Sequence, residues 1–336
     1  MSHSNLDQLL GAVVDADQVL ILPHNDPDPD AIASAFGLKK LLMQRRTNSS
    51  VQIAFQGIIG RAENKALVRY LGRPLRPLTT ATLQHATCIA LVDTQPGTGN
   101  NPLPADVTPH IVLDHHVWRD ETTAAAFYDV RPGFGSTSTI VAEYLYAAGI
   151  VPNQMLATAL FYGIKTDTMG LVRGATPADV EMFHTLQALT DLNALDEIQR
   201  AQVPASYFKG LVTAFQAARI RGALLTTYLG AMSYPDQAAE IADTLLRLQG
   251  TTWVICVGYY EDELIISVRS RARSGGAGQL VRAVVGDLGM AGGHGTMAAG
   301  HVPLNGVDPA RLAETLEQRA LKLLDLDSHA VGAPLI

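Results

Sequence analysis

The chain has 336 residues, of which 47% are hydrophobic and 17% are charged, and its formal net charge is -7. This length predicts two domains with separate cores, and the composition excludes long disordered stretches. The negative charge argues against electrostatic capture of long duplex nucleic acid, although local cations can still hold a short phosphorylated ligand.

In the N-terminal half, short apolar runs rich in β-branched residues alternate with segments of helical period. They predict strands at residues 19–23, 51–56, 87–92 and 111–113, and helices at about 30–44, 138–148 and 153–162. This alternation is typical of a doubly wound α/β domain, in which helices cover both faces of a parallel sheet. We expect this domain to span residues 1–190.

Residues 191–221 are predicted to form a helical connector, with Pro204 as a breaker. Residues 222–336 then predict a smaller C-terminal α/β domain. Its expected strands lie near residues 223–229, 253–260, 264–271 and 300–304, and its helices at 236–248, 279–287 and 308–324. A loop of glycines and a histidine precedes the last of these strands.

The sequence shows no sign of export or of a membrane partner. Its apolar runs are interrupted well before the roughly 18 residues that span a bilayer. The N-terminus MSHSNLDQLL lacks the basic and apolar regions of a secretion signal, so we expect a cytoplasmic protein. Cys88 and Cys256 each lie in a strand-like run, which predicts buried reduced thiols.

Four polar groups follow predicted strands or close a predicted helix of the first domain. They are HNDPDPD at residues 24–30, Asp93, Asp-His-His at residues 114–116, and KTDT at residues 165–168. Open α/β sheets bind ligands at the carboxyl ends of their strands. Each group alone is also compatible with a polar turn or a helix cap. All four together predict a site.

Carboxylates and imidazoles are ligands of divalent manganese, iron and zinc, and an oxygen-rich set favours manganese, with magnesium as the alternative. Two such ions about 4 Å apart can polarise a phosphoryl oxygen, share a hydroxide nucleophile and stabilise the leaving oxygen. Phosphoester hydrolysis needs these three functions. A serine hydrolase and a P-loop nucleotidase are disfavoured, because neither G-x-S-x-G nor the P-loop motif occurs.

Taken in order, HNDPDPD, LVDT, LDHH and YGIKTDT resemble the four motifs of the DHH phosphoesterase superfamily. In the second half, GGHG at residues 292–295 and AAG at 298–300 are similar to the signature of the DHH-associated C-terminal domain. The resemblance covers nearly the whole chain and is closest to the oligoribonuclease and 3'-phosphoadenosine-5'-phosphate phosphatase (nano-RNase) branch. Pro29 and Ala291 stand at positions where glycine is common in the superfamily. Neither is an implied metal ligand, so these departures concern the choice of substrate more than catalysis.

The resemblance implies two divalent metal ions, with manganese preferred over magnesium. The implied metal ligands are His24, Asp28 and Asp93 for one ion, and Asp30, Asp93, His115 and Asp167 for the other. Asp93 would bridge the two ions. His116 would face the substrate phosphate as a donor or acid, although either histidine of the pair could be the inward-facing ligand. Asp114 would orient a histidine from outside the ligand shell.

The expected substrate-binding residues lie in the C-terminal domain and are Arg269, Arg271, Arg273, Gly292, Gly293 and His294. The three arginines alternate along a predicted strand, so their side chains should share one face. Such a face is either solvated or a phosphate clamp, and the neighbouring glycine-rich loop favours a clamp. The run STST at residues 136–139 could be a second phosphate-binding site, but helix capping is favoured.

The resemblance therefore implies a hydrolase of phosphoester bonds in short oligoribonucleotides, dinucleotides or 3'-phosphoadenosine-5'-phosphate, with its active site in the cleft between the domains. An inorganic pyrophosphatase or exopolyphosphatase is a rival, although the Ser-Arg-Lys-Lys-Gln signature of family II pyrophosphatases is missing. A nucleotide sensor without catalysis is disfavoured, because every expected ligand is present. Chain-length preference and oligomeric state, including a homodimer, stay open.

Overall fold

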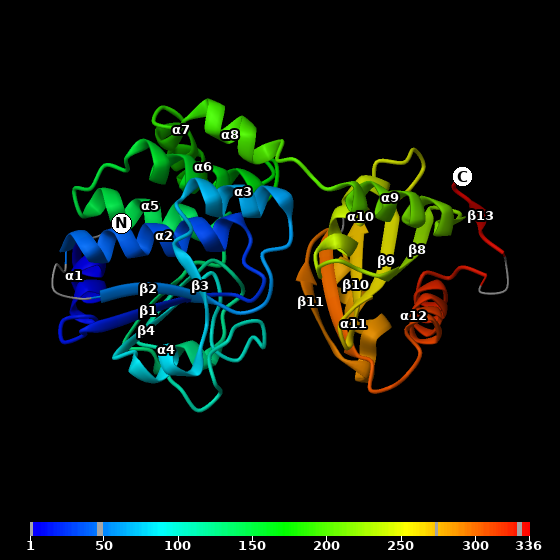
Figure 1. Ribbon diagram of the computed structural model, residues 1–336, viewed down its shortest axis with the longest axis horizontal. Helices are drawn as coiled ribbons and strands as arrows, with labels where there is room; N and C mark the ends of the chain where they lie inside the picture. Colours follow the sequence, from blue (N-terminus) through cyan, green and yellow to red (C-terminus); the bar gives the residue numbers. More distant parts are fainter. Residues whose placement is uncertain (1–2, 46–49, 273–274, 328–330) are drawn as a thin grey trace. The chain divides into compact units, whose positions relative to one another are not determined.

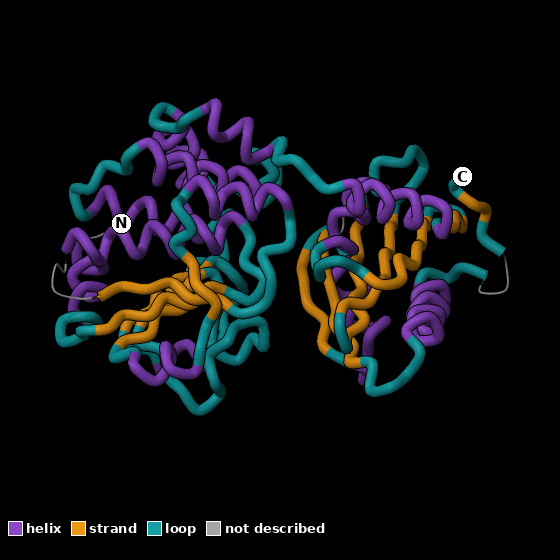
Figure 2. The backbone as a smooth tube through the Cα atoms, in the orientation of Figure 1, coloured by secondary structure: helices purple, strands orange, loops and turns teal. Residues whose placement is uncertain are grey.

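The computed structural model describes residues 3–45, 50–272, 275–327 and 331–336. The chain forms two compact units, Met1–Ala201 and Gln202–Ile336, each built from a sheet and flanking helices (Figures 1 and 2). The predicted connector is not a separate segment. Helix α8 (Leu192–Gln199) buries Leu195 and Ile198 in the core of the first unit, whereas α9 (Ala205–Ala217) belongs to the second.

The first unit contains a six-stranded parallel sheet in the order β3-β2-β1-β4-β5-β6. Its strands are β1 (Gln18–Pro23), β2 (Ser50–Phe55), β3 (Leu75–Pro77), β4 (Cys88–Val92), β5 (Ile111–Asp114) and β6 (Phe127–Val130). The predicted doubly wound parallel sheet is therefore confirmed. Only the two edge strands, β3 and β6, were not predicted, because each is short and buries few side chains.

Helices cover both faces of this sheet, with α2 above and α4 below in Figure 1. The helices are α1 (His3–Gly11), α2 (Pro29–Arg45), α3 (Ala62–Tyr70), α4 (Thr80–His85), α5 (Thr137–Ala147), α6 (Gln154–Asp167), α7 (Pro177–Gln187) and α8. Alternate residues of β1 enter opposite cores: Val19 and Ile21 pack under the helices of one face, and Leu20 and Leu22 on the other. This period of two is what buried strands require.

The strand order places a topological switch point between β1 and β4. The chain leaves β1 for β2 on one side, and leaves β4 for β5 on the other side. The connections therefore diverge from the carboxyl ends of β1 and β4 and leave a crevice there, which is where open α/β sheets bind ligands.

The second unit has a mixed seven-stranded sheet in the order β11-β12-β10-β9-β8-β7-β13. Its strands are β7 (Arg219–Arg221), β8 (Leu224–Ala231), β9 (Trp253–Tyr260), β10 (Glu263–Ser270), β11 (Met290–His294), β12 (Met297–Pro303) and β13 (Ala333–Pro334). Among these neighbours only β8 and β9 are parallel. One core packs with α11 (Ala277–Val285) and α12 (Pro309–Leu323), the other with α9 and α10 (Gln237–Leu245).

The second unit differs from the sequence-based expectation in several details, among them the short strands β7 and β13, which were not predicted. The glycines and histidine expected in a loop form edge strand β11, which pairs with β12, because glycine has no side chain that signals a strand. Strand β10 ends at Ser270, one residue earlier than predicted. None of the helices in the described part of the chain combines the length and apolar character of a membrane span.

Candidate metal centre

The predicted metal ligands converge at the switch point of the first unit. They come from the carboxyl ends of β1, β4 and β5 and from the end of α6. Three overlapping groups have ligand atoms within 4.8 Å of one another: His24, Asp28 and Asp93; Asp93, His115 and His116; and Asp30, His115 and Asp167. Asp93 and His115 each belong to two groups, so the three form one continuous cluster.

Asp93 is the central carboxylate of the cluster, 2% exposed at the end of β4. Its Oδ2 lies 3.6 Å from His24 Nε2, and its Oδ1 lies 3.6 Å from His115 Nε2. Its φ angle of 61° is left-handed, a conformation that costs about 1 kcal/mol or more in a residue other than glycine. The backbone thus turns sharply after β4 and directs the two carboxylate oxygens toward different histidines.

His24 and His115 both direct Nε2 toward the carboxylates, because a backbone carbonyl holds the other ring nitrogen of each. The Nδ1 of His24 donates to the carbonyl of Asn25 at 2.7 Å, and the Nδ1 of His115 donates to the carbonyl of Phe134 at 3.0 Å. Each ring therefore directs Nε2 into the cluster. Among the described residues, the buried Nε2 of His115 makes no hydrogen bond of good geometry, although Asp167 Oδ2 lies 3.0 Å away. Once it has released its proton, a nitrogen held this way among carboxylates can bind a metal ion.

Asp30 is held by the N-terminus of α5. The backbone N–H of Thr137 donates to its Oδ2 at 2.7 Å, and the N–H of Ser138 donates to its Oδ1 at 2.8 Å. Unpaired N–H groups and the helix dipole stabilise a carboxylate at this position. Ser136 caps the helix, as favoured from the sequence. The alternative of a phosphate site there conflicts with Asp30, which already takes these donors.

The electrostatics of the cluster favour a cation. Burial and the neighbouring carboxylates of Asp93 and Asp167 raise the pKa of Asp30 well above its usual range. Burial by itself would lower the pKa of His115, but the carboxylates of Asp167 and Asp93 raise it well above its ordinary value. Without metal, protons on Asp30 and His115 therefore offset the carboxylate charge, and bound divalent ions would supply that positive charge instead.

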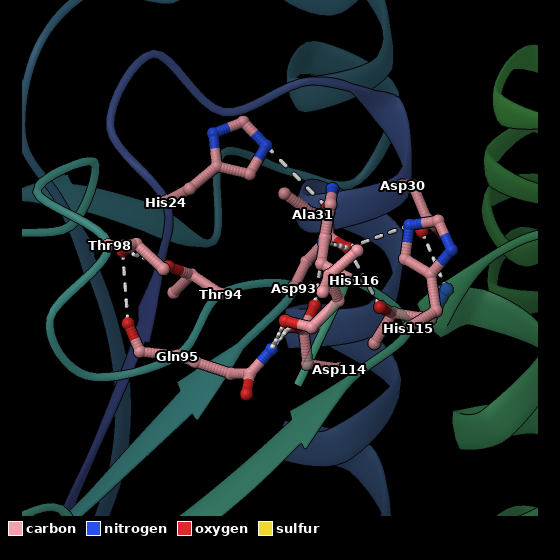
Figure 3. Close-up of polar contacts among 12 residues, drawn as sticks. His24, Asp30, Ala31, Asp93, Thr94, Gln95, Thr98, Asp114, His115 and His116 are labelled. Carbon is pink, nitrogen blue, oxygen red and sulfur yellow. Dashed lines mark hydrogen bonds and ion pairs between the residues drawn. The ribbon is translucent and has the colours of Figure 1, made fainter. Parts of the chain in front are cut away.

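The two adjacent histidines lie in different environments. The His115 side chain is 11% exposed and its Nε2 lies 3.0 Å from Asp167 Oδ2. The His116 side chain is 43% exposed, and its Nδ1 lies 2.8 Å from Oδ1 of the fully buried Asp114. Figure 3 shows both rings close to Asp93. His115 therefore occupies the interior position expected of a ligand, and Asp114 orients His116.

Sequence reasoning missed two residues at this centre. The hydroxyl of Thr137 donates to Asp93 Oδ1 at 2.7 Å, and Nη2 of Arg173 lies 3.6 Å from Asp167 Oδ1. Thr137 belongs to the run STST, but its contact depends on how α5 packs beside β4. Arg173 follows Asp167 by six residues and also donates to its backbone carbonyl. No motif marks that pairing in the sequence.

The predicted substrate-binding residues lie in the second unit and are not equivalent. Arg269 is 7% exposed and donates to Asp243 and Ser267, so it holds the fold together. Arg271 is exposed and follows the end of β10, whereas Arg273 lies outside the described residues. The expectation of three arginines on one strand face is therefore wrong, because the strand ends at Ser270.

The predicted glycines of the second unit lie in the edge strand β11. Gly292 and Gly293 are exposed and pair with Ala299 and Ala298 of β12. His294 pairs with Met297 through the same ladder. The strand can offer backbone groups to a ligand only along the side that β12 does not cover.

The first unit is thus a doubly wound α/β domain with a cluster of carboxylates and histidines at its switch point that could hold metal ions. Residues 18–164 match the family described as "DHH family, N-terminal domain". This part of the chain is therefore similar to the DHH family N-terminal domain, and the match includes the first three motifs and ends before Asp167 of the fourth.

Known relatives extend the similarity beyond this domain. An uncharacterized protein of Methanocaldococcus jannaschii is 35% identical over 288 residues, which are 85% of this chain and 58% of the relative. The cyclic-di-AMP phosphodiesterase GdpP of Geobacillus thermodenitrificans is 28% identical over 296 residues, 81% of this chain and 45% of the relative. The chain spans about half the length of these two relatives.

A solved structure shares the fold over both units. The exopolyphosphatase-related protein from Bacteroides fragilis superposes with a TM-score of 0.70 over 96% of each chain, at 16% identity. This likeness supports the α/β architecture of both units, and at that identity it carries no information on the substrate.

Proposed function

We propose that the protein is a metal-dependent hydrolase of phosphoester bonds. The observation that carries the proposal is the convergence of the DHH-type ligands on Asp93, with two histidines whose Nε2 atoms point into the cluster. When bound there, divalent ions would act as Lewis acids and lower the pKa of a bound water molecule toward neutrality. An oxygen-rich ligand set favours manganese, with magnesium as the second choice.

We assign metal-binding, positioning and proton-donating roles to the residues of the centre. One ion would be held by His24, Asp28 and Asp93, and the other by Asp30, Asp93, His115 and Asp167. The Thr137 hydroxyl fixes one oxygen of Asp93, and the N-terminus of α5 fixes Asp30. His116 donates its Nδ1–H to Asp114, and in the doubly protonated ring its Nε2–H can then donate to a phosphate oxygen or the leaving oxygen.

We propose short oligoribonucleotides, dinucleotides or 3'-phosphoadenosine-5'-phosphate as substrates. The similarity to a cyclic-di-AMP phosphodiesterase covers 81% of this chain and supports a nucleotide phosphoester. A shorter similarity, over 46% of this chain, to a probable manganese-dependent inorganic pyrophosphatase of Lactococcus lactis makes pyrophosphate the second candidate. Exposed Arg271 is the candidate in the second unit for binding the part of the substrate that does not react, because its guanidinium can form a bidentate pair with phosphate.

One panel of assays tests the proposal. Protein stripped of metal and reloaded with manganese is given 3'-phosphoadenosine-5'-phosphate, di- to pentaribonucleotides, cyclic dinucleotides, pyrophosphate and polyphosphate. We expect turnover of nucleotide esters that disappears in Asp93→Ala, because that change removes a ligand from both ions. Full turnover in excess chelator, or hydrolysis of pyrophosphate and polyphosphate alone, would contradict it.

A further inference from the structure

The fully buried side chain of Gln95 joins two loops of the metal centre. Its Nε2 donates to Asp114 Oδ2 at 2.7 Å and to the Val117 carbonyl at 3.0 Å. Its Oε1 accepts from the Arg119 N–H at 2.9 Å and from the Thr122 hydroxyl at 3.0 Å. Both N–H groups and both acceptor positions of the amide are therefore used, and all four partners belong to one segment, residues 114–122.

These partners also fix which end of the amide faces Asp114. If nitrogen and oxygen were exchanged, the amide oxygen of Gln95 would meet a carboxylate and a carbonyl, and its NH₂ group would meet the Arg119 N–H, which cannot accept. Only the orientation with Nε2 toward Asp114 satisfies every group, and buried polar groups are rarely left unsatisfied. Figure 3 shows this contact between Gln95 and Asp114.

Asp114 connects Gln95 to His116 through its two carboxylate oxygens. One carboxylate oxygen of Asp114 is taken by Gln95, and the other lies 2.8 Å from Nδ1 of His116. The same Nδ1 also lies 3.8 Å from Oδ1 of Asp93. Asp114 therefore accepts this N–H group, while Asp93, the central carboxylate of the cluster, lies beyond hydrogen-bond distance but near enough to take it if Asp114 moved.

We propose that Gln95 is a positioning residue for His116. By holding Asp114, it keeps the His116 Nδ1–H on Asp114 and away from Asp93, which leaves Nε2 for the substrate and Asp93 for the metals. Because Gln95 also anchors Val117 and Arg119, it fixes the backbone that follows His116. The kinetic consequence rests on the function proposed above, whereas the hydrogen-bond chain itself does not.

Gln95→Glu is the sharpest variant, because it keeps the shape and replaces the donor by an acceptor facing Asp114. We expect kcat to fall by about 10- to 100-fold, the usual range for residues behind the ligand shell, with KM and bound manganese retained. In wild type, the His116 Nδ1–H should give a downfield, slowly exchanging proton signal in NMR, assigned by its absence in His116→Ala. Gln95→Glu should lose this signal.

A second change should repair the first. In the double variant Gln95→Glu with Asp114→Asn, the amide at position 114 can donate to the new carboxylate and still accept from His116 Nδ1–H. We expect the slowly exchanging signal to return and kcat to recover by about tenfold over Gln95→Glu. A residue that only stabilises the fold would not be rescued through a change in hydrogen-bond polarity.

Thr158→Val is the matched control. Thr158 is also fully buried in the first unit and accepts a hydrogen bond from the Asp191 N–H at 2.9 Å, with no contact to the metal centre. We expect it to lower the melting temperature as Gln95→Glu does and to leave kcat unchanged.

Several outcomes would overturn the proposal. Wild-type kcat in metal-loaded Gln95→Glu would do so, as would persistence of its Nδ1–H signal, loss of its metals, or an equal fall of kcat in Thr158→Val. If the wild-type protein hydrolyses none of the phosphoesters, the proposed function fails. The NMR signal in wild type and in Gln95→Glu still decides whether Gln95 holds His116.

Discussion

At the scale of single residues, the side chains of the metal centre are oriented largely by backbone groups. Carbonyls of Asn25 and Phe134 orient the two inward histidines, and N–H groups of α5 hold Asp30. Because these partners remain when a ligand is truncated, variants at the ligands should change the chemistry more than the fold. Three predictions follow from this arrangement.

His115→Ala should lower the bound metal, because it removes an interior ligand that faces both Asp93 and Asp167. His116→Ala should keep the metals and mainly lower turnover, because the His116 ring is directed by Asp114 and is half exposed. Metal analysis of the two purified variants, set beside their kcat values, checks this. The reverse pattern would exchange the roles of the two histidines.

Thr137→Val should weaken manganese binding by about tenfold, because it removes the hydroxyl that fixes Asp93 Oδ1 and preserves the side-chain shape. Thr137→Ser keeps the hydroxyl and serves as the matched control, with nearly wild-type affinity. Titration calorimetry with manganese measures both without an activity assay. Equal affinity in the two variants would show that the hydroxyl does not position Asp93.

Metal affinity should rise with pH up to about 10, because metal and protons compete for the same histidines. Burial alone would lower the pKa of His24, but the carboxylates of Asp28 and Asp93 raise it to about 10. The ring is therefore protonated at neutral pH without metal, and metal binding must release that proton. Calorimetry in two buffers with different ionisation enthalpies detects the release. Identical heats in both buffers would exclude it.

At the scale of elements, the centre depends on three helices that pack tightly together. Asp30 begins α2, Thr137 and Ser138 begin α5, and Gly163 lies in the last turns of α6. A Cβ on Gly163 would lie 3.2 Å from Asp30 Oδ1 and closer still to the Ser138 hydroxyl. The absence of a side chain at residue 163 therefore allows α6 to approach the helix N-termini that hold Asp30.

Gly163→Ala should destabilise the protein by about 1–3 kcal/mol, the usual range for overpacking, and weaken metal binding through Asp30. Gly133→Ala is the control, because nothing lies within 4 Å of a Cβ built there. Thermal unfolding of the metal-free proteins and manganese titration of both variants measure the two effects. A Gly163→Ala protein as stable as Gly133→Ala would contradict the close approach.

At the scale of the whole molecule, the two units have separate hydrophobic cores. Residues of the two clusters beside the parallel sheet all precede residue 202, and those of the two clusters beside the mixed sheet all follow it. Each unit therefore has what an independently folding domain needs. The boundary at residue 201 keeps α8 with the first unit.

A fragment of residues 1–201 should fold cooperatively and bind manganese with the stoichiometry of the full chain, because every proposed ligand precedes residue 170. It should hydrolyse dinucleotides poorly, since binding energy from the remote part of a substrate helps to position the reacting bond. Calorimetric unfolding and steady-state kinetics check the two parts. Dinucleotide turnover at full-chain efficiency would show that the second unit contributes nothing to catalysis.

The sequence by itself determined the α/β class of the first unit, the positions of its central strands and the identities of the candidate metal ligands that converge there. Strands β1, β4 and β5 are runs of buried apolar residues, so their pattern is local and strong. The ligands directly follow those strands or close α6, and the ends of parallel strands meet at one edge. Short edge strands such as β3 lack that pattern, and β11 is rich in glycine, so neither was predicted.

Only the tertiary structure decided how the ligands are held and which histidine faces inward. Carbonyls 19 residues away orient His115, and N–H groups more than 100 residues away hold Asp30, so no local pattern reports these contacts. The early end of β10 and the pairing of Arg269 with Asp243 likewise depend on packing. Hydrogen bonds between distant segments form only after the cores fix the backbone, which is why sequence identifies the ligands but not their orientation.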